Sequence, residues 1–104
     1  MKCYIRCMKN IKTVQEELNK HDIQSELGSK SGWSENSIIF QADDCQILLY
    51  VDTDEKNNLN LSYYDLFPKG EYSEIHDEYM EETMTSYRGS SSSVEEMLDE
   101  VCVW

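Results

Sequence analysis

The stretch from Ser37 to Leu66 most constrains the fold, because its apolar residues come in short runs of the kind that β-strands carry. The sequence SIIFQADDCQILLYVD predicts two strands, near residues 37–42 and 45–51. Asp43 and Asp44 are expected to form the tight turn between them, since short acidic side chains tolerate turn geometry. After a polar turn, TDEKNN, the alternating sequence LNLSYYDL predicts another strand near residues 59–66.

In the N-terminal region the spacing of the apolar residues changes from every second residue to every third or fourth. In KCYIRCM, Cys3, Ile5 and Cys7 alternate with polar or larger residues, and this pattern predicts a half-buried strand over residues 2–8. Ile11, Val14 and Leu18 then recur at the spacing of an amphipathic helix, for which Asn10 is a plausible N-cap. Residues 24–36 contain two glycines and several serines, and are expected to form a polar connection.

A second amphipathic segment begins with EYSEIHDEYMEE, residues 71–82. Its large side chains are spaced mostly at i, i+3 and i+4, which predicts a helix of about 17 residues with an inward aromatic seam. Six acidic residues cover much of the remaining surface of that helix. Like charges at these spacings repel, each pair costing a few tenths of a kcal/mol, so stability alone does not account for them.

The C-terminal region predicts one more helix. The sequence GSSSS at residues 89–93 indicates a short flexible joint, and Ser93 to Glu96 matches a capping box. An apolar stripe of Val94, Met97, Leu98 and Val101 then continues through a helix over residues 94–103, and Trp104 directly after it can extend the stripe. The expected fold is a single α+β domain spanning residues 1–104, in the order β-α-β-β-β-α-α. Its sheet would be four-stranded and mostly antiparallel, with the helices packed on one face.

Catalytic and metal-binding patterns do not emerge from the sequence. The four glycines form neither a phosphate-binding loop nor a dinucleotide fingerprint, and the four cysteines include no CxxC pair. Asp52 to Asn60 superficially resembles a calcium loop, but Asn57 and Tyr63 occupy the positions that require glycine and an acid. We therefore expect a polar turn there, small buried cysteines, and a protein that is not an enzyme and uses no cofactor or metal.

Charge sets the class of partner. The formal net charge is −12, and it is concentrated beyond residue 30, where 3 basic residues face 17 acidic ones. This balance disfavours direct binding to nucleic acid or to an anionic membrane, and it favours a basic protein. The N-terminal segment has no apolar run long enough for a signal peptide or a membrane span, so we expect a cytoplasmic protein.

The predicted binding surface combines acids with aromatic residues, which commonly anchor interfaces. Its residues are Glu71, Glu74, Asp77, Glu78, Glu81, Glu82, Tyr72, Tyr79, Asp52 and Asp54. The leading hypothesis is an immunity protein of bacterial origin that occludes the cationic cleft of a nuclease-type toxin. A phage anti-defence inhibitor that mimics nucleic acid is an alternative. A third class is an adaptor or assembly subunit that docks through its C-terminal helix.

Overall fold

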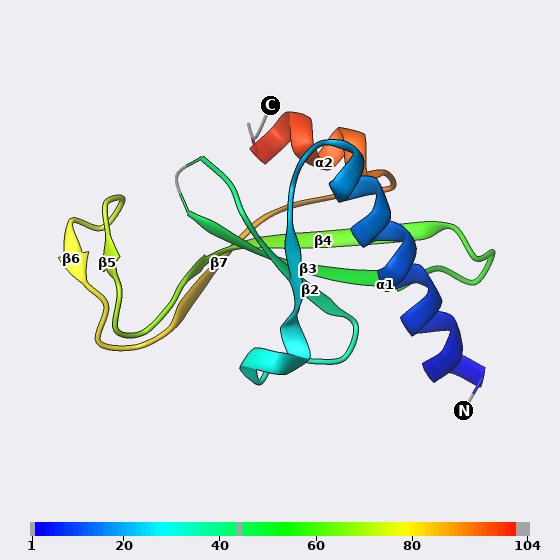
Figure 1. Ribbon diagram of the computed structural model, residues 1–104, viewed down its shortest axis with the longest axis horizontal. Coiled ribbons are helices and arrows are strands. Elements are labelled where there is room, and N and C mark those ends of the chain that lie inside the picture. Colours follow the sequence, from blue (N-terminus) through cyan, green and yellow to red (C-terminus); the bar gives the residue numbers. More distant parts are fainter. Residues whose placement is uncertain (1, 44, 102–104) are drawn as a thin grey trace.

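A five-stranded antiparallel sheet with two helices forms the body of the protein (Figure 1). The computed structural model describes residues 2–43 and 45–101 and, within the first helix, side chains from Asn10 onward. The elements are α1 (Lys2–Lys20), β1 (Ser25–Leu27), the short 3-10 helix η1 (Gly28–Ser31), β2 (Ser37–Gln41), β3 (Gln46–Thr53), β4 (Leu59–Phe67), β5 (Tyr72–Ser73), β6 (Glu78–Tyr79), β7 (Met84–Ser91) and α2 (Val94–Val101). The sheet order is β1-β2-β3-β4-β7, while β5 and β6 pair separately. The α+β class is confirmed, with five strands in the sheet where four were expected.

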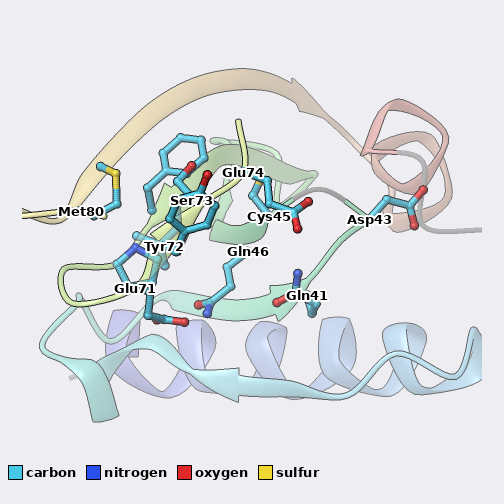
Figure 2. Close-up of a pocket in the computed structure, with 12 residues that line it drawn as sticks. Gln41, Asp43, Cys45, Gln46, Glu71, Tyr72, Ser73, Glu74 and Met80 are labelled. Carbon is cyan, nitrogen blue, oxygen red and sulfur yellow. The ribbon is translucent and has the colours of Figure 1, made fainter. Parts of the chain in front are cut away.

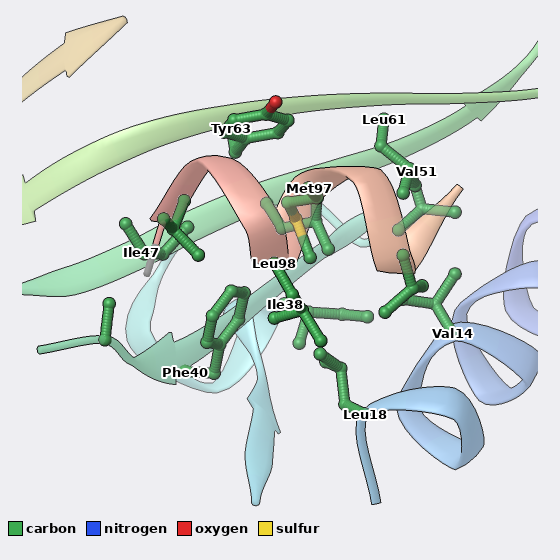
Figure 3. Close-up of a cluster of buried hydrophobic side chains, with 14 of the residues drawn as sticks. Val14, Leu18, Ile38, Phe40, Ile47, Val51, Leu61, Tyr63, Met97 and Leu98 are labelled. Carbon is green, nitrogen blue, oxygen red and sulfur yellow. The ribbon is translucent and has the colours of Figure 1, made fainter. Parts of the chain in front are cut away.

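Both helices contribute to one apolar core on the same face of the sheet (Figure 3). Val14 and Leu18 of α1 and Met97 and Leu98 of α2 are at most 1% exposed. They belong to one cluster with the inward residues of the strands, among them Ile38, Phe40, Ile47, Leu49, Val51, Leu61 and Tyr63. The expectation of helices on a single face is therefore confirmed.

The three central strands lie where the sequence places them. β2, β3 and β4 pair in antiparallel register, with Ile39 opposite Leu48 and Leu48 opposite Tyr64. The polar turn between β3 and β4 is also confirmed, because the Asp54 carboxylate accepts hydrogen bonds from the backbone N–H groups of Lys56 and Asn58 at 2.8 and 2.9 Å. Asp43 lies in the β2–β3 connection, and Asp44 is outside the described residues.

The strand expected over residues 2–8 is wrong, because α1 begins at Lys2. Asn10 consequently lies inside the helix and does not cap it. Positions 4, 7, 11, 14 and 18 follow the same alternating spacing of three and four residues, so the helical period already extends to the N-terminus. Cys3 and Cys7 are thus about 6 Å apart along a helix axis, at 1.5 Å per residue, and not at the two ends of a strand segment.

The connection between α1 and β2 contains structure that the sequence analysis missed. It holds the three-residue strand β1, which pairs with β2, followed by η1. Gly28 is buried, and a Cβ atom there would lie only 1.9 Å from the hydroxyl oxygen of Ser37, itself completely buried. Glycine at this position therefore allows the η1 turn to pack against the start of β2.

The helix expected over residues 71–87 is also wrong, and the segment instead forms β5, β6 and β7. The flexible joint expected over residues 89–93 is wrong as well, since β7 continues to Ser91 beside β4. Gly89 lies under α2, where a Cβ atom would come within 2.7 Å of a Glu100 carboxylate oxygen. Gly89 therefore lies against the side chains of Glu100 and Tyr63 within the paired strand β7 and is not a hinge.

The C-terminal helix is confirmed for Val94–Val101, and residues 102–104 lie outside the described part of the chain. Ser93 caps it, because the backbone N–H of Glu96 donates to the Ser93 hydroxyl at 3.2 Å. The Tyr63 hydroxyl donates to the Glu100 carboxylate, which ties the helix to β4. Burial, and then this hydrogen bond to a carboxylate, raise the pKa of Tyr63 well above its usual value.

Candidate functional site

A hairpin arm, residues 69–83, extends from the end of the sheet where β4 stops and β7 starts (Figure 1). Tyr72 pairs with Tyr79 across its short ribbon. Backbone hydrogen bonds at 2.9 Å join Gly70 N–H to Met80 C=O and Met80 N–H to Glu71 C=O, extending the pairing toward the body. Because β4 and β7 pair directly with each other, the arm is an excursion between two neighbouring strands.

The base of the arm is anchored in the body of the protein. Met80 is 2% exposed and belongs to the core cluster, together with Phe67 at the end of β4. The Lys69 N–H donates to the Thr83 hydroxyl at 3.0 Å and joins the two sides of the base. In the turn between β5 and β6, His76 packs edge-on against the Phe67 ring, with ring centroids 4.6 Å apart. The arm is therefore held against the body at its base and at its turn, while most of its side chains face solvent.

Exposed large apolar side chains are confined to this region among the described residues with placed side chains. They are Tyr72 (56% exposed), Ile75 (52%), Tyr79 (64%), Met84 (46%) and Tyr87 (61%), all in the arm or in β7. Tyr87 also continues an edge-to-face row of rings with Tyr64 and Tyr50, on the sheet face opposite the helices. The inward aromatic seam expected here is wrong, because most of these side chains point outward.

The acidic side chains of the arm surround these apolar groups. All six, Glu71, Glu74, Asp77, Glu78, Glu81 and Glu82, are exposed. The ion pairs found among the described residues, Lys20–Glu17 and Arg88–Asp65, involve none of them. The Tyr72 hydroxyl donates to the Asp77 carboxylate, and this hydrogen bond raises the pKa of Tyr72. The arm thus presents the Tyr72 ring hydrogen-bonded to the Asp77 carboxylate. Around this pair lie acidic side chains that take part in neither of the two ion pairs.

Asp52 and Asp54 do not join this group. They lie at the β3–β4 turn, at the other end of the long axis from the arm (Figure 1). Asp52 accepts a hydrogen bond from the Asn36 side chain at 2.9 Å, and Asp54 holds the turn. The hydrogen bond from Asn58 N–H is the main reason that the pKa of Asp54 is lowered. These two carboxylates have local structural partners, so the ten residues predicted for binding split into two separate groups.

A pocket of about 300 Å³ lies beneath the arm (Figure 2). Gln41, Asp43, Cys45 and Gln46 contribute to it from the β2–β3 connection, and residues 66–68, 71–74 and 80 contribute from β4 and the arm. Sequence reasoning missed this site because its two halves are far apart in the chain. The order of the strands could have indicated the pocket. In an antiparallel sheet of neighbouring β2, β3 and β4, the β2–β3 turn and the C-terminal end of β4 lie at the same end of the sheet.

The described residues were also searched for metal-binding groups and for helices that could cross a membrane. They contain no group of three or more His, Cys, Asp or Glu side chains arranged to hold a metal ion. None of their helices has both the length and the apolar character needed to cross a membrane. Cys45 is buried in the core cluster, in line with the role expected for the cysteines, whereas Cys102 is outside the described residues.

Comparisons with protein-family models, with curated proteins and with solved structures found no match to this chain.

Proposed function

We propose that this protein binds and neutralises a basic protein partner, as an immunity protein blocks a nuclease-type toxin by covering its cationic cleft. The arm supports this proposal most directly, because exposed apolar side chains and uncompensated carboxylates are interleaved there. Exposed aromatic residues supply contact area in protein interfaces, while carboxylates favour a cationic partner and speed its association. The protein acts by occlusion, in the cytoplasm, without catalysis or a cofactor.

The exposure of large apolar side chains on the arm, which is unfavourable in water, also supports a binding role. Burial of Met80 anchors it, but Tyr72, Ile75 and Tyr79 remain more than half exposed. Large apolar groups exposed in one patch usually mark an interaction site, whereas a coat that only improves solubility needs charge alone. Carboxylates without cationic partners are also free to pair with groups on another molecule.

The test is capture of a partner from the native host, with the full chain as bait. The arm variant E78Q/E81Q/E82Q removes three exposed carboxylates and leaves the anchoring residues unchanged. The control variant E26Q/E35Q/E55Q removes the same charge from exposed positions elsewhere. We expect the wild type and the control to retain a basic protein and the arm variant to lose at least about 90% of it, a tenfold change in affinity corresponding to about 1.4 kcal/mol. Equal capture by all three proteins contradicts the proposal.

Two other classes predict different outcomes. A nucleic-acid mimic would displace DNA from several unrelated DNA-binding proteins, whereas an inhibitor of one toxin protects against that toxin alone. An adaptor docking through its C-terminal helix would need an exposed apolar stripe on α2. Val94, Met97, Leu98 and Val101 are instead buried in the protein's own core, so the described part of α2 offers no such stripe.

A further inference from the structure

The pocket beneath the arm has an apolar wall of fixed shape. Phe67 and Met80 are 6% and 2% exposed, and Leu66 and Cys45 beside them are also buried. Because these side chains are packed into the body, they cannot collapse into the opening. A wall of this kind suits a short hydrocarbon chain, such as the methylene stem of a long polar side chain.

Hydrogen-bond acceptors line the polar side of the same pocket. The carboxylates of Asp43, Glu71 and Glu74 line it together with the amides of Gln41 and Gln46, and none of the described residues that line it is a lysine or an arginine. The amide nitrogen of Gln41 donates to the Ala42 carbonyl at 2.9 Å, which leaves the amide oxygen of Gln41 as an acceptor. In Figure 2 Asp43 lies on one side of the pocket and Glu71, Tyr72 and Met80 lie on the other, with Glu74, Gln41 and Gln46 between them.

We propose that this pocket takes an arginine side chain of the basic partner. The inference rests on the proposed function and names the feature of the partner that anchors it. The stem of the arginine packs against Phe67 and Met80, and the guanidinium lies among the carboxylates of Asp43 and Glu74 and the Gln46 amide. A pocket of about 300 Å³ is at the small end of the range for ligand sites, which suits one side chain and not a whole peptide.

Arginine fits this arrangement better than lysine. A guanidinium presents five N–H donors in a rigid plane, so it can reach acceptors on two sides of a pocket at once. An ammonium group is compact and strongly hydrated, and it would satisfy fewer of these acceptors while losing more solvation. The arrangement of acceptors on both sides of an apolar wall therefore selects for the planar cation.

The experiment titrates the isotope-labelled full chain with N-acetyl-arginine amide and records the backbone amide resonances by NMR. N-acetyl-lysine amide carries the same charge and is the matched ligand. We expect saturable shifts centred on residues 41–46 and 71–74 with the arginine compound, and binding of the lysine compound that is weaker by about threefold or more. Shifts that are spread over the acidic surface without saturation overturn the proposal, and equal binding of the two compounds overturns the choice of arginine.

Two variants sharpen this titration, and both change exposed residues only, so the fold is retained. D43N/E74Q removes two pocket carboxylates and should weaken binding of the arginine compound by about fivefold, at the modest strength typical of exposed charge pairs. E35Q/E55Q removes two exposed carboxylates that lie outside both the arm and the pocket lining, and it should leave the binding unchanged. Equal loss in both variants would mean that general negative charge, and not the pocket, holds the ligand.

The outcome also separates this inference from the proposed function. If the wild type shows no pocket binding while E78Q/E81Q/E82Q still loses the captured partner, the arginine anchor is wrong and the arm remains the binding surface. If the pocket binds the arginine compound but capture is indifferent to the arm carboxylates, the proposed function is wrong and the pocket remains a guanidinium site.

Discussion

At the scale of single residues, acids with the same charge have different roles according to their hydrogen-bond partners. Asp54 accepts bonds from two backbone N–H groups and from the Asn58 side chain, and so serves the fold. Asp77 accepts a bond from the Tyr72 hydroxyl at the tip of the arm, where its backbone has φ of 52°. Glu78, in the arm ribbon, is exposed and is not part of an ion pair. The number of acids in a segment therefore says less about binding than the contacts of each one.

Asp54 gives a prediction about pH. Its pKa in the folded protein is lowered from its ordinary value of 3.8 because backbone and side-chain donors bind the carboxylate. The resulting stabilisation is present above the pKa of the unfolded chain and is lost as the pH falls through the lower folded pKa. We expect Asp54→Ala to lower the Tm at neutral pH, and the difference from wild type to shrink as the pH falls below 3.8, the ordinary pKa of the group, and through its lower folded pKa.

Thermal unfolding followed by circular dichroism across this pH range measures the effect. Glu55→Ala is the matched control, since it removes an exposed acid from the same turn without removing the acceptor of these hydrogen bonds. A Tm difference for Asp54→Ala that stays constant down to acid pH would show that charge-assisted hydrogen bonding is not what holds the turn.

At the scale of elements, the arm is anchored through a buried methionine, and a second methionine directly after the arm is exposed, so the two allow a direct comparison of environments. Met80 is 2% exposed in the core cluster, whereas Met84 at the start of β7 is 46% exposed. Met80→Ala should lower the free energy of unfolding by about 2–4 kcal/mol, because it leaves a cavity where the arm meets the body. Met84→Ala should change the free energy of unfolding by about 0.5 kcal/mol or less.

Urea denaturation of the two variants distinguishes these environments. Since both changes remove the same atoms, any difference between them reports burial and not residue type. Similar small losses for both variants would mean that the arm is not packed against the core, and the exposure of Tyr72 and Tyr79 would then carry less weight as evidence for a binding surface.

The elements that sequence reasoning predicted correctly are those whose local pattern allows one interpretation. β2, β3 and β4 carry short apolar runs between turn residues, and α2 combines a serine cap with a complete apolar stripe. In both cases propensity, period and end signals agree. The turn at Asp54 follows the same rule.

The strand expected over residues 2–8 and the helix expected over residues 71–87 were wrong because their patterns fit both periods. Over residues 2–8 three alternating apolar positions suggested a strand, but spacings of three and four residues continue from position 4 to position 18. Over residues 72–87 the helical spacing is present, yet β7 is stabilised by pairing with β4, a partner that lies far away in the sequence. Asp77 in the left-handed region and the Tyr72–Tyr79 pairing then define a ribbon. Contacts of this kind are non-local, so periodicity alone does not reveal them.

The candidate site was predicted in part for the same reason. The acidic and aromatic residues of the arm were identified from composition, and the structure brings most of them together. Asp52 and Asp54 were grouped with them by charge alone, but the β3–β4 turn lies at the far end of the molecule. The pocket formed with Gln41, Asp43 and Gln46 required knowledge of which strand ends meet.

At the scale of the whole molecule, the acidic arm lies at one end of the longest axis. The longest dimension is 42 Å, and the acidic arm occupies one end of it, while the net positive first 30 residues include α1, β1 and most of η1. If the protein acts as proposed, the acidic arm attracts the basic cleft of the partner during association. Such steering acts on the association rate and weakens as salt screens the charges.

Stopped-flow association with the captured basic partner tests this steering. We expect the association rate constant to fall by about tenfold or more between low and high ionic strength, and E78Q/E81Q/E82Q to reduce this salt dependence more than E26Q/E35Q/E55Q does. The two variants lower the charge equally, so a difference between them reports where the charge lies. An association rate indifferent to salt in the wild type would contradict steering.

The arm joins two strands that pair directly with each other, so its sequence can vary without changing the pairing of the sheet. β4 and β7 remain neighbours in the sheet whatever joins them, and Met80 is the main attachment of the excursion to the interior. The exposed side chains among residues 71–79 can therefore change while the sheet keeps its architecture, provided that the buried Ser73 and the His76 contact with Phe67 are retained. If the protein acts as proposed, changes within this one short segment are enough to give it a new partner specificity.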